Sequence, residues 1–261
     1  MYKGFWGFGV LGFWGLRLAG LSISDAITLV EETGSTNADL ASSLRDGTAP
    51  AEGTWLVTRR QTAGKGRQGR EWFDGAGNFM GSSVVEIRDG DPPPASLSFV
   101  AALAVADAVD NAAGKSGTAE LKWPNDVLVG GAKVSGILLE MVGKHVVVGI
   151  GVNLAKAPDL PDRKTIALAD LGATPTLDGF AESLAASFAK FLNYWREDGL
   201  VLILRAFISA SIHYNGDKIS VHDTDGTKIE GIFAGLDIED GALKLNLADG
   251  SERVIRAGDI S

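Results

Sequence analysis

Cysteine is absent from this chain of 261 residues, and histidine occurs only three times, at His145, His213 and His222. Without cysteine the chain has no disulfide framework, no thiolate nucleophile and no cysteine-type zinc site. The histidines are too scattered to show the spacing of a metal site. Covalent catalysis through either side chain is therefore excluded, and an electrostatic mechanism is favoured.

Positive charge is also scarce. The sequence has 24 Lys and Arg residues against 33 Asp and Glu residues, which gives a net charge of −9. Non-specific binding to nucleic acid relies on a positive surface, so this balance argues against it. The apolar content of 45% and the charged content of 22% are those of an ordinary globular protein, and the length is enough for one large domain and a small one.

No long hydrophobic run typical of a membrane helix stands near the beginning of the sequence. Gly, Phe, Trp and Leu alternate over residues 1–21, but the run is short, rich in glycine and interrupted by Arg17. We expect residues 1–24 to be a poorly ordered extension that is too short for a separate DNA-binding domain. We also expect a cytoplasmic protein with no membrane partner.

The available cations are concentrated in one stretch, residues 61–72. Three glycines alternate there with three cations, and a tryptophan ends the run: Gly64, Lys65, Gly66, Arg67, Gly69, Arg70 and Trp72. Glycine lets the backbone come close to a ligand, and arginine offers carboxylate and phosphate oxygens a planar fork of donors. The stretch therefore predicts a loop that surrounds one or two anions.

Two nucleotide-binding patterns are superficially present. Gly64, Gly66 and Gly69 satisfy the dinucleotide pattern G-x-G-x-x-G, but that site needs a helix directly after it, and the sequence that follows reads as a loop. Residues 114–116 look like the end of a P-loop, but the first glycine of that motif would fall on Val109, and a helix precedes it. We exclude both sites.

Hydrophobic periodicity and turn residues predict an α+β fold with a mixed sheet flanked by helices. Strands are expected at 27–31, 54–60, 79–88, 119–123, 126–129, 133–141 and 145–150, and helices at 37–45, 96–113, 180–195 and 200–212. Ser35 or Thr36 can cap the first helix. Short alternating strands after residue 213 predict a small SH3-like β-barrel. The predicted domains are thus a catalytic domain, 25–212, and an SH3-like domain, 213–261.

Five motifs resemble the biotin protein ligase family, in the family's order, over about residues 25–261. They are Gly34-Ser-Thr-Asn37, the loop at 61–72, Lys122-Trp-Pro-Asn-Asp126, Lys133-Val-Ser-Gly-Ile137 and Gly149-Ile-Gly-Val-Asn153. The family's loop usually has arginine where this chain has Lys65, so a point charge replaces a planar fork there. The resemblance implies a class II synthetase-like catalytic domain in the short form of the family, without an N-terminal DNA-binding domain.

The resemblance also implies a two-step reaction. Biotin and ATP first give biotinyl-5′-adenylate and pyrophosphate, and a lysine of a biotin carboxyl carrier domain then takes the biotinyl group and releases AMP. The residues implied to bind biotin are Ser35, Thr36, Asn37, Gln61, Lys65, Gly66, Arg67, Lys133 and Gly136. Those implied to bind ATP are Arg70, Trp72, Asn125, Lys133 and Asn153.

Catalysis is assigned to Arg67, Lys133 and Asp126. The first step brings a carboxylate against a polyphosphate, and two unit charges roughly 4 Å apart repel by about 4 kcal/mol at an effective dielectric of about 20. Arg67 and Lys133 would offset this repulsion, and Mg²⁺ is expected on the phosphates. Asp126 would attract the carrier lysine as an ammonium and accept its proton. Residues 64–76 are expected to be mobile without ligand and to close over the adenylate.

Three alternatives are weighed against this function. A lipoate or octanoate ligase would be expected to carry Arg-Arg before three glycines and a histidine soon after, and this chain has neither. The second alternative is a regulator that binds biotinyl-adenylate and DNA, and the short N-terminal stretch and the acidic charge argue against it. A degenerate, non-catalytic biotin binder is a third alternative, and the joint presence of Arg67, Asp126 and Lys133 argues against it. The sequence does not specify the acceptor carboxylase, the task of the C-terminal barrel or the oligomeric state, and a homodimer is left open.

Overall fold

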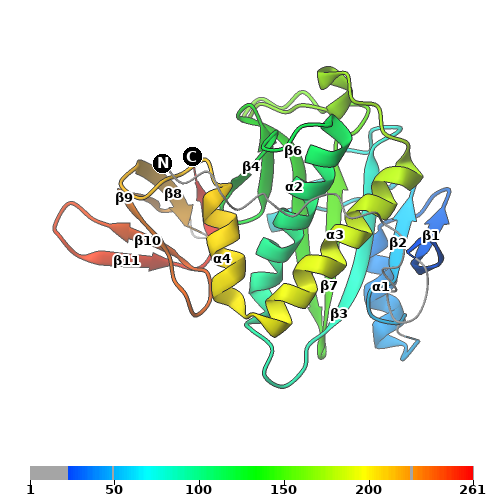
Figure 1. The fold of residues 1–261 in the computed structure, drawn as a ribbon, viewed down its shortest axis with the longest axis horizontal. Helices are drawn as coiled ribbons and strands as arrows, with labels where there is room; N and C mark the ends of the chain where they lie inside the picture. Colours follow the sequence, from blue (N-terminus) through cyan, green and yellow to red (C-terminus); the bar gives the residue numbers. More distant parts are fainter. Residues whose placement is uncertain (1–22, 49, 224–225, 261) are drawn as a thin grey trace.

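The computed structural model describes residues 23–48, 50–223 and 226–260. The predicted N-terminal extension, residues 1–24, therefore lies almost entirely outside the described residues. The described chain forms a seven-stranded sheet and a five-stranded sheet, with helices packed on the larger one (Figure 1). The fold is α+β, as predicted.

The large sheet has the strand order β1-β2-β3-β7-β6-β5-β4. Only β1 and β2 are parallel, and the other neighbouring pairs are antiparallel, so the predicted mixed sheet is confirmed. Gly130 and Gly131 form the turn of the predicted β5–β6 hairpin, at positive φ angles of 56° and 77° that favour glycine. The strands are β1 (Ile27–Val30), β2 (Trp55–Thr58), β3 (Phe79–Glu86), β4 (Ala119–Lys122), β5 (Asp126–Val129), β6 (Ala132–Val142) and β7 (His145–Val152).

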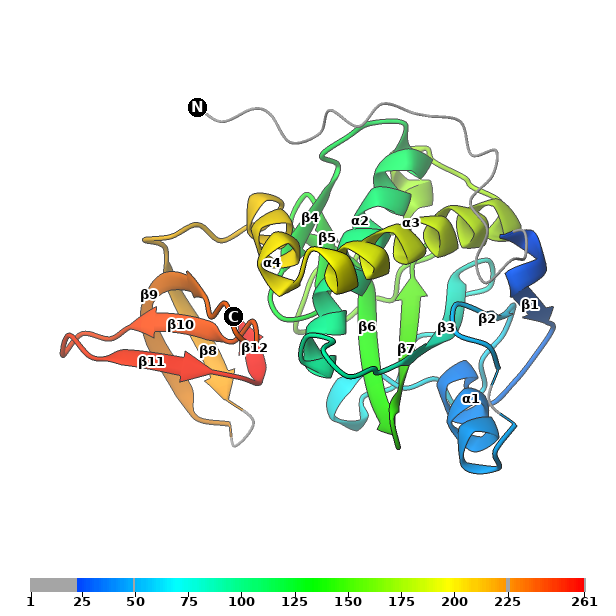
Figure 2. The same ribbon diagram turned by 60° about the horizontal axis from the view of Figure 1, so that its bottom comes forward.

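Helices cover both faces of this sheet. One face carries α1 (Thr36–Arg45), and the other carries α2 (Leu97–Ala113) and α3 (Leu177–Glu197) (Figure 2). The predicted cap of α1 is confirmed, because the Ser35 hydroxyl accepts a hydrogen bond from the backbone N–H of Ala38.

The alternation of side chains along β7 shows how the two faces differ. Val146, Val148 and Ile150 belong to the large core that contains α2 and α3, whereas Val147 packs in a separate cluster with Leu40 of α1. Successive side chains of a strand point to opposite faces. The odd-numbered residues of β7 from 147 to 151 therefore face the α1 side, where the candidate site lies.

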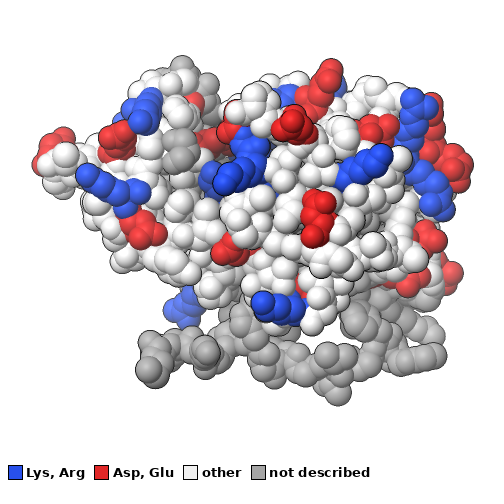
Figure 3. All heavy atoms as spheres, turned by 90° about the horizontal axis from the view of Figure 1, so that it is seen from above, with Lys and Arg blue, Asp and Glu red and all other residues white. Residues whose placement is uncertain are grey.

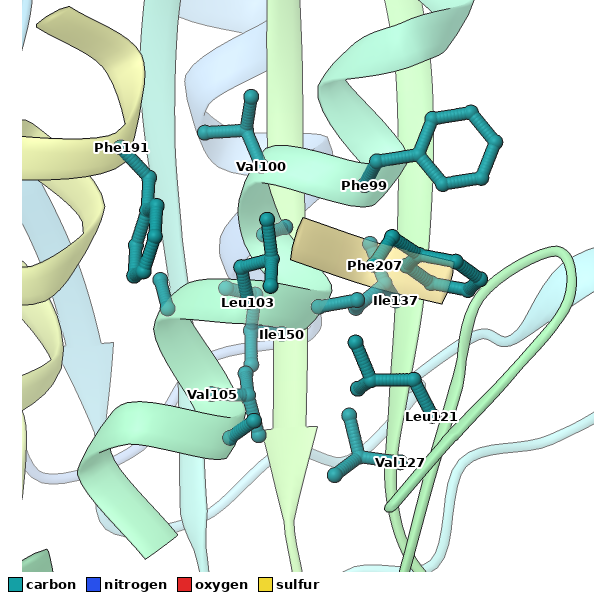
Figure 4. Packing of buried hydrophobic residues seen from close by; sticks show 14 of the residues in the cluster. Phe99, Val100, Leu103, Val105, Leu121, Val127, Ile137, Ile150, Phe191 and Phe207 are labelled. Carbon is teal, nitrogen blue, oxygen red and sulfur yellow. The ribbon is translucent and has the colours of Figure 1, made fainter. Parts of the chain in front are cut away.

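The main core lies between the large sheet and the α2–α3 layer. Figure 4 shows residues of four strands and three helices packed there: Phe99, Val100, Leu103, Val105, Leu121, Val127, Ile137, Ile150, Phe191 and Phe207. The segment Pro94–Ala113, which contains α2, is long and apolar enough to cross a membrane by length and composition, but 72% of its apolar window is buried inside the fold. Its apolar composition is explained by its place in the core.

The small sheet is antiparallel, with the order β11-β10-β9-β8-β12. Its strands are β8 (Lys218–Asp223), β9 (Lys228–Leu236), β10 (Leu243–Asn246), β11 (Glu252–Ile255) and β12 (Gly258–Ile260). Its size and its antiparallel pairing agree with the predicted SH3-like domain.

The helix before this sheet is shorter than predicted. α4 spans Leu200–Ser209 and does not continue to Ile212. Residues 210–212 instead pair with the edge strand β4: the Leu121 N–H donates to the Ala210 carbonyl at 2.8 Å, and the Ile212 N–H donates to the Leu121 carbonyl at 2.9 Å. The backbone groups of these residues form hydrogen bonds with the edge strand β4 in place of another helical turn. Apolar periodicity alone cannot predict this outcome, because it contains no information about the edge strand.

The small sheet also packs directly on the large domain. The Trp123 indole N–H donates to the Gly241 carbonyl at 3.1 Å. A Cβ on Gly241 would lie 2.3 Å from a ring carbon of Phe99, so the β9–β10 turn approaches α2 as closely as glycine allows. One hydrophobic cluster contains residues of both sheets, and the predicted core position of Trp123 is confirmed.

Charged side chains of both signs are interspersed over the face of the molecule that Figure 3 shows. On the face in Figure 3, no extended basic surface is visible among the described residues. The expectation that the chain does not bind nucleic acid stays a prediction.

Candidate functional site

A cavity of about 230 Å³ lies on the α1 side of the large sheet. Every site residue named from the sequence lines it: Ser35, Thr36, Asn37, Gln61, Lys65, Gly66, Arg67, Arg70, Trp72, Asn125, Asp126, Lys133, Gly136 and Asn153. These residues come from α1, from the loop at 61–72 and from β5, β6 and the end of β7. The fold thus brings together segments that are more than a hundred residues apart.

The cationic loop folds back on itself as a short hairpin. The Gly66 N–H donates to the Arg70 carbonyl at 2.7 Å, and the Trp72 N–H donates to the Gly64 carbonyl at 3.0 Å. Gly69 lies at the tip with a φ of 73°, which only glycine adopts without strain. No helix longer than a single 3-10 turn occurs in this loop, in agreement with the exclusion of a dinucleotide site.

The two arginines of the loop are held by the C-terminal sheet. Arg67 donates to Asp259 Oδ1 at 3.2 Å, to the Gly258 carbonyl at 3.2 Å and to Asn125 Oδ1 at 2.8 Å. Arg70 donates to Asp259 Oδ2 at 3.1 Å. One carboxylate on β12 therefore bridges both arginines, and it lines the cavity itself. We call this contact the Asp259 bridge.

Lys133 and Asp126 face each other across the β5–β6 hairpin. Lys133 Nζ donates to Asp126 Oδ1 at 2.6 Å, and the two side chains are 19% and 20% exposed. Asp126 therefore holds a cation of the same chain in this conformation.

Glycines form the floor of the cavity. A Cβ on Gly151 would lie 2.2 Å from Trp72 Cε2, and one on Gly136 would lie 2.9 Å from the same indole. A Cβ on Gly149 would lie 2.2 Å from Asn37 Oδ1. Both residues of β7 face the α1 side, so their lack of a side chain makes room for an indole and for an amide. The Gly-Ile-Gly spacing follows from that requirement.

A connected set of polar side chains lies at the α1 end of the cavity. The Thr36 N–H donates to Gln61 Oε1 at 2.9 Å, and the Thr36 and Ser82 hydroxyls are 2.7 Å apart. The Ser82 hydroxyl donates to Asn37 Oδ1 at 2.6 Å, and Asn37 Nδ2 donates to Glu140 Oε2 at 2.6 Å. Ser82 is fully buried, whereas Glu140 is exposed.

Asn153 lines the cavity, and one of its side-chain atoms lacks a partner among the described residues. Its Nδ2 donates to the Ile166 carbonyl at 3.3 Å and reaches the Lys133 carbonyl at 3.5 Å. Its Oδ1 is buried and has no hydrogen-bond partner among the described residues. A buried unpartnered acceptor is costly, so a ligand donor at this point would stabilise the site.

Sequence reasoning missed several residues of the cavity wall. The segment 155–176 was expected to be a plain connection, but Pro158, Leu160, Asp162, Arg163 and Thr165 line the cavity. The hydrogen bond from Arg163 lowers the pKa of the Asp162 carboxyl below its ordinary value. These charges had no recognisable motif.

Two further residues were missed for different reasons. Ser82 could have been found, because a polar residue inside the largely apolar strand β3 needs a partner when it is buried. Asp259 carried no such signal, because its partners are about 190 positions away in the sequence. The functional roles assigned to the site residues stay predictions.

Known proteins share both the sequence pattern and the fold. Residues 30–153 match the model of the Biotin/lipoate A/B protein ligase family, and residues 216–261 match that of the Biotin protein ligase C terminal domain. A biotin–[acetyl-CoA-carboxylase] ligase of Paracoccus denitrificans is 38% identical over 249 residues, which cover 89% of this chain and 98% of the relative. The chain belongs to the biotin protein ligase family.

Two other members of the biotin protein ligase family support this assignment. A biotin–[acetyl-CoA-carboxylase] ligase of Mycobacterium tuberculosis is 36% identical over 239 residues, covering 90% of this chain and 88% of the relative. The structure of a biotin protein ligase from Aquifex aeolicus in complex with biotin and ATP superposes with a TM-score of 0.77 at 26% identity, covering 90% of this chain and 97% of that one. The predicted membership of the biotin protein ligase family is confirmed.

Proposed function

We propose that this protein is an ATP-dependent ligase that forms biotinyl-5′-adenylate from biotin and ATP and then transfers the biotinyl group to a lysine of a biotin carboxyl carrier domain. The observation that carries the proposal is the convergence of Lys133 and Arg67 on one cavity with a polar α1 end and a glycine floor. A lipoate or octanoate ligase has less support, because the acyl chains of its substrates present no polar head to the α1 end.

The first step joins two anions. A carboxylate oxygen of biotin forms a bond to the α-phosphorus of ATP, and the bond from that phosphorus to the bridging oxygen breaks, releasing pyrophosphate. Lys133 and Arg67 would lie beside the oxygens that gather charge. Arg67 is already held in place by the Asp259 bridge, so it needs little reorganisation during the reaction, whereas Lys133 exchanges Asp126 for the reacting oxygens.

Mg²⁺ fits this site as a companion of the phosphates. The described residues contain no group of three or more His, Cys, Asp or Glu side chains that could hold a metal ion. Mg²⁺ commonly binds through substrate phosphates and one or two carboxylates, and two carboxylates that pair with arginines, those of Asp162 and Asp259, line the cavity. When bound, the ion would lower the charge of the polyphosphate.

The nucleobase would be recognised by the asparagines at the ends of β4 and β7. The unpartnered Asn153 Oδ1 suits an exocyclic amine, which adenine has. The Trp72 indole contacts the backbone at Gly136 and Gly151 and lies next to it on the cavity wall. Asn125 is held by its own donation to the Ile137 carbonyl at 2.7 Å, so its position is fixed before a ligand binds.

The second step requires an uncharged amine. The nitrogen of the carrier lysine forms a bond to the acyl carbon of the adenylate, the acyl C–O bond breaks, and AMP leaves. Lysine is an ammonium near neutral pH, so a proton must be removed first. Once Lys133 interacts with the oxygens of the adenylate, the Asp126 carboxylate is released from its ion pair and can accept that proton.

Several expectations stay predictions alongside this function. They are the cytoplasmic location, the absence of nucleic-acid and membrane partners, the open question of a homodimer and the closure of residues 64–76 over the adenylate. The identity of the carboxylase that supplies the carrier domain stays open as well.

Biotin-dependent exchange of labelled pyrophosphate into ATP tests the proposal. We expect the wild type to be active and Lys133→Ala to lose at least about 10²-fold, the scale of removing one preorganised donor. Lys144→Ala is the matched control, because Lys144 lies in the turn that follows β6, is exposed and pairs with Glu86. Absence of exchange in the wild type with biotin, ATP and Mg²⁺ would overturn the proposed function.

A further inference from the structure

One acidic residue outside the predicted site ends the polar chain at the α1 end of the cavity. Glu140 lies on β6, on the same face as Gly136, and its carboxylate accepts from Asn37 Nδ2 at 2.6 Å. The chain continues inward through Ser82 to Thr36, which lines the cavity. Glu140 itself does not line it.

The direction of every hydrogen bond in this chain follows from Glu140. An ionised carboxylate can only accept, so the NH₂ group of Asn37 must point toward Glu140. Its Oδ1 then points toward Ser82, whose single hydroxyl proton is donated to it. With that proton committed, Ser82 can only accept from Thr36 across their 2.7 Å contact.

Thr36 is the point where this direction reaches the cavity. Its hydroxyl proton is drawn to Ser82, and the other neighbouring atom, Gln61 Oε1 at 3.2 Å, is also only an acceptor. In either case the proton points into the protein. The hydroxyl oxygen therefore offers a lone pair to the cavity, while Gln61, whose oxygen is engaged by Thr36, keeps its NH₂ group as a donor.

We propose that Glu140 is a positioning residue that sets the direction of the Asn37–Ser82–Thr36 hydrogen bonds, so that the cavity selects a ligand head with N–H donors over an acyl chain that has none. A cyclic urea, with two N–H groups and one carbonyl, complements a Thr36 acceptor and a Gln61 donor. This inference rests on the proposed function for the identity of the ligand as biotin.

Three substitutions of Glu140 distinguish an effect on the direction of the hydrogen bonds from an effect on side-chain packing. Glu140→Gln can accept from or donate to Asn37, so the direction is no longer fixed, and we expect the Kd for biotin to rise about threefold to tenfold. Glu140→Lys can only donate, which reverses the chain, so that Ser82 donates to Thr36 and takes up a lone pair of the Thr36 oxygen. We expect its Kd for biotin to rise at least about tenfold, because Ser82 then competes with the ligand N–H for the Thr36 oxygen. Glu140→Ala should fall between the two.

Binding is measured by calorimetry with biotin and, separately, with ATP. Met141→Lys is the matched control, because Met141 is the next residue on β6, is 58% exposed and points to the opposite face of the sheet. It adds a positive charge at nearly the same place without touching Asn37, and it should leave the Kd for biotin unchanged. The Kd for ATP should be unchanged in all variants.

A double-mutant cycle with Ser82→Ala tests whether the effect travels through the chain. Removing Ser82 breaks the link, so adding Glu140→Lys to Ser82→Ala should raise the Kd for biotin by less than about threefold. With octanoate as the probe in the pyrophosphate-exchange assay, Glu140→Lys should leave the rate unchanged, so that its preference for biotin over octanoate falls.

The outcomes distinguish this inference from the proposed function. An unchanged Kd for biotin in Glu140→Lys, an equal loss of ATP binding, or full additivity with Ser82→Ala would overturn the inference. A wild type that binds biotin but forms no acyl-adenylate would overturn the proposed function and leave the role of Glu140 to be decided by the binding data. A wild type that does not bind biotin would overturn both.

Discussion

The Asp259 bridge predicts that the C-terminal sheet keeps the cationic loop closed over the cavity. The perturbation is Asp259→Ala, which removes the acceptor of both Arg67 and Arg70. The side chain of Asp259 is 36% exposed, so each ion pair is partly screened and contributes about 0.5–1 kcal/mol. Together they contribute about 1–2 kcal/mol, and their loss would raise the open population of the loop by about fivefold to thirtyfold.

An open loop exposes the adenylate to water. With biotin and ATP but no acceptor, we expect Asp259→Ala to release AMP about fivefold to thirtyfold faster than the wild type. Trypsin should also cleave the variant faster after Lys65, Arg67 or Arg70. Glu230→Ala is the control, because Glu230 lies in the same sheet but pairs only with nearby Lys228.

Salt gives a second readout of the same contact. Exposed ion pairs weaken as ionic strength rises, so AMP release by the wild type should increase with salt toward the rate of Asp259→Ala, whose own rate should change little. Equal AMP release and equal loop cleavage in the wild type and Asp259→Ala at low salt would refute the reasoning.

Three further predictions concern the cavity floor and the outer ion pairs. Gly149→Ala would place a methyl group against the buried Asn37 amide. It should raise the KM for biotin at least about tenfold and change the KM for ATP little, as measured by steady-state pyrophosphate exchange. Gly151→Ala would collide with Trp72 and should raise the KM for ATP instead. Identical effects of the two variants would contradict the assignment of Gly149 to the biotin part of the cavity and of Gly151 to the ATP part. Burial raises the pKa of Glu52, but hydrogen bonds from Arg196 outweigh it, so the folded-state pKa lies below 4.5. This stabilisation is complete above pH 4.5 and is lost as the pH falls through the folded-state pKa, so Glu52→Gln should unfold about 2–6 °C lower at pH 7 in a thermal melt and should approach the wild type below about pH 4.

Local sequence patterns predicted the elements of this fold well where a single periodicity decides the structure. The apolar face of α2 and the hairpin at Gly130–Gly131 depend on side chains and turn residues within a few positions of each other. The end of α4 depends instead on hydrogen bonds to β4, which is about ninety positions away. No window of sequence around Ile212 contains that information.

The residues of the candidate site were likewise predictable only where a local sequence motif contains them. Its cations and glycines stand in compact motifs, so they could be named from the sequence, and the structure places them around one cavity. Their partners could not be named: Glu140 looks like one of many exposed acids on a strand, and Asp259 lies in the other domain. A carboxylate becomes informative only when the fold shows which donor it faces.

The packing of Trp123 and Phe99 against Gly241 has a consequence for the exchange of parts between relatives. The C-terminal sheet contacts the large domain at two separate places: at this apolar contact and at the Asp259 bridge. A C-terminal sheet grafted from another ligase would therefore have to match the host twice, with a glycine at the β9–β10 turn and an acid opposite the loop arginines. A chimera that keeps the glycine at the β9–β10 turn but lacks the acid should fold normally. It should nevertheless consume ATP by hydrolysis of the adenylate, without transferring biotin.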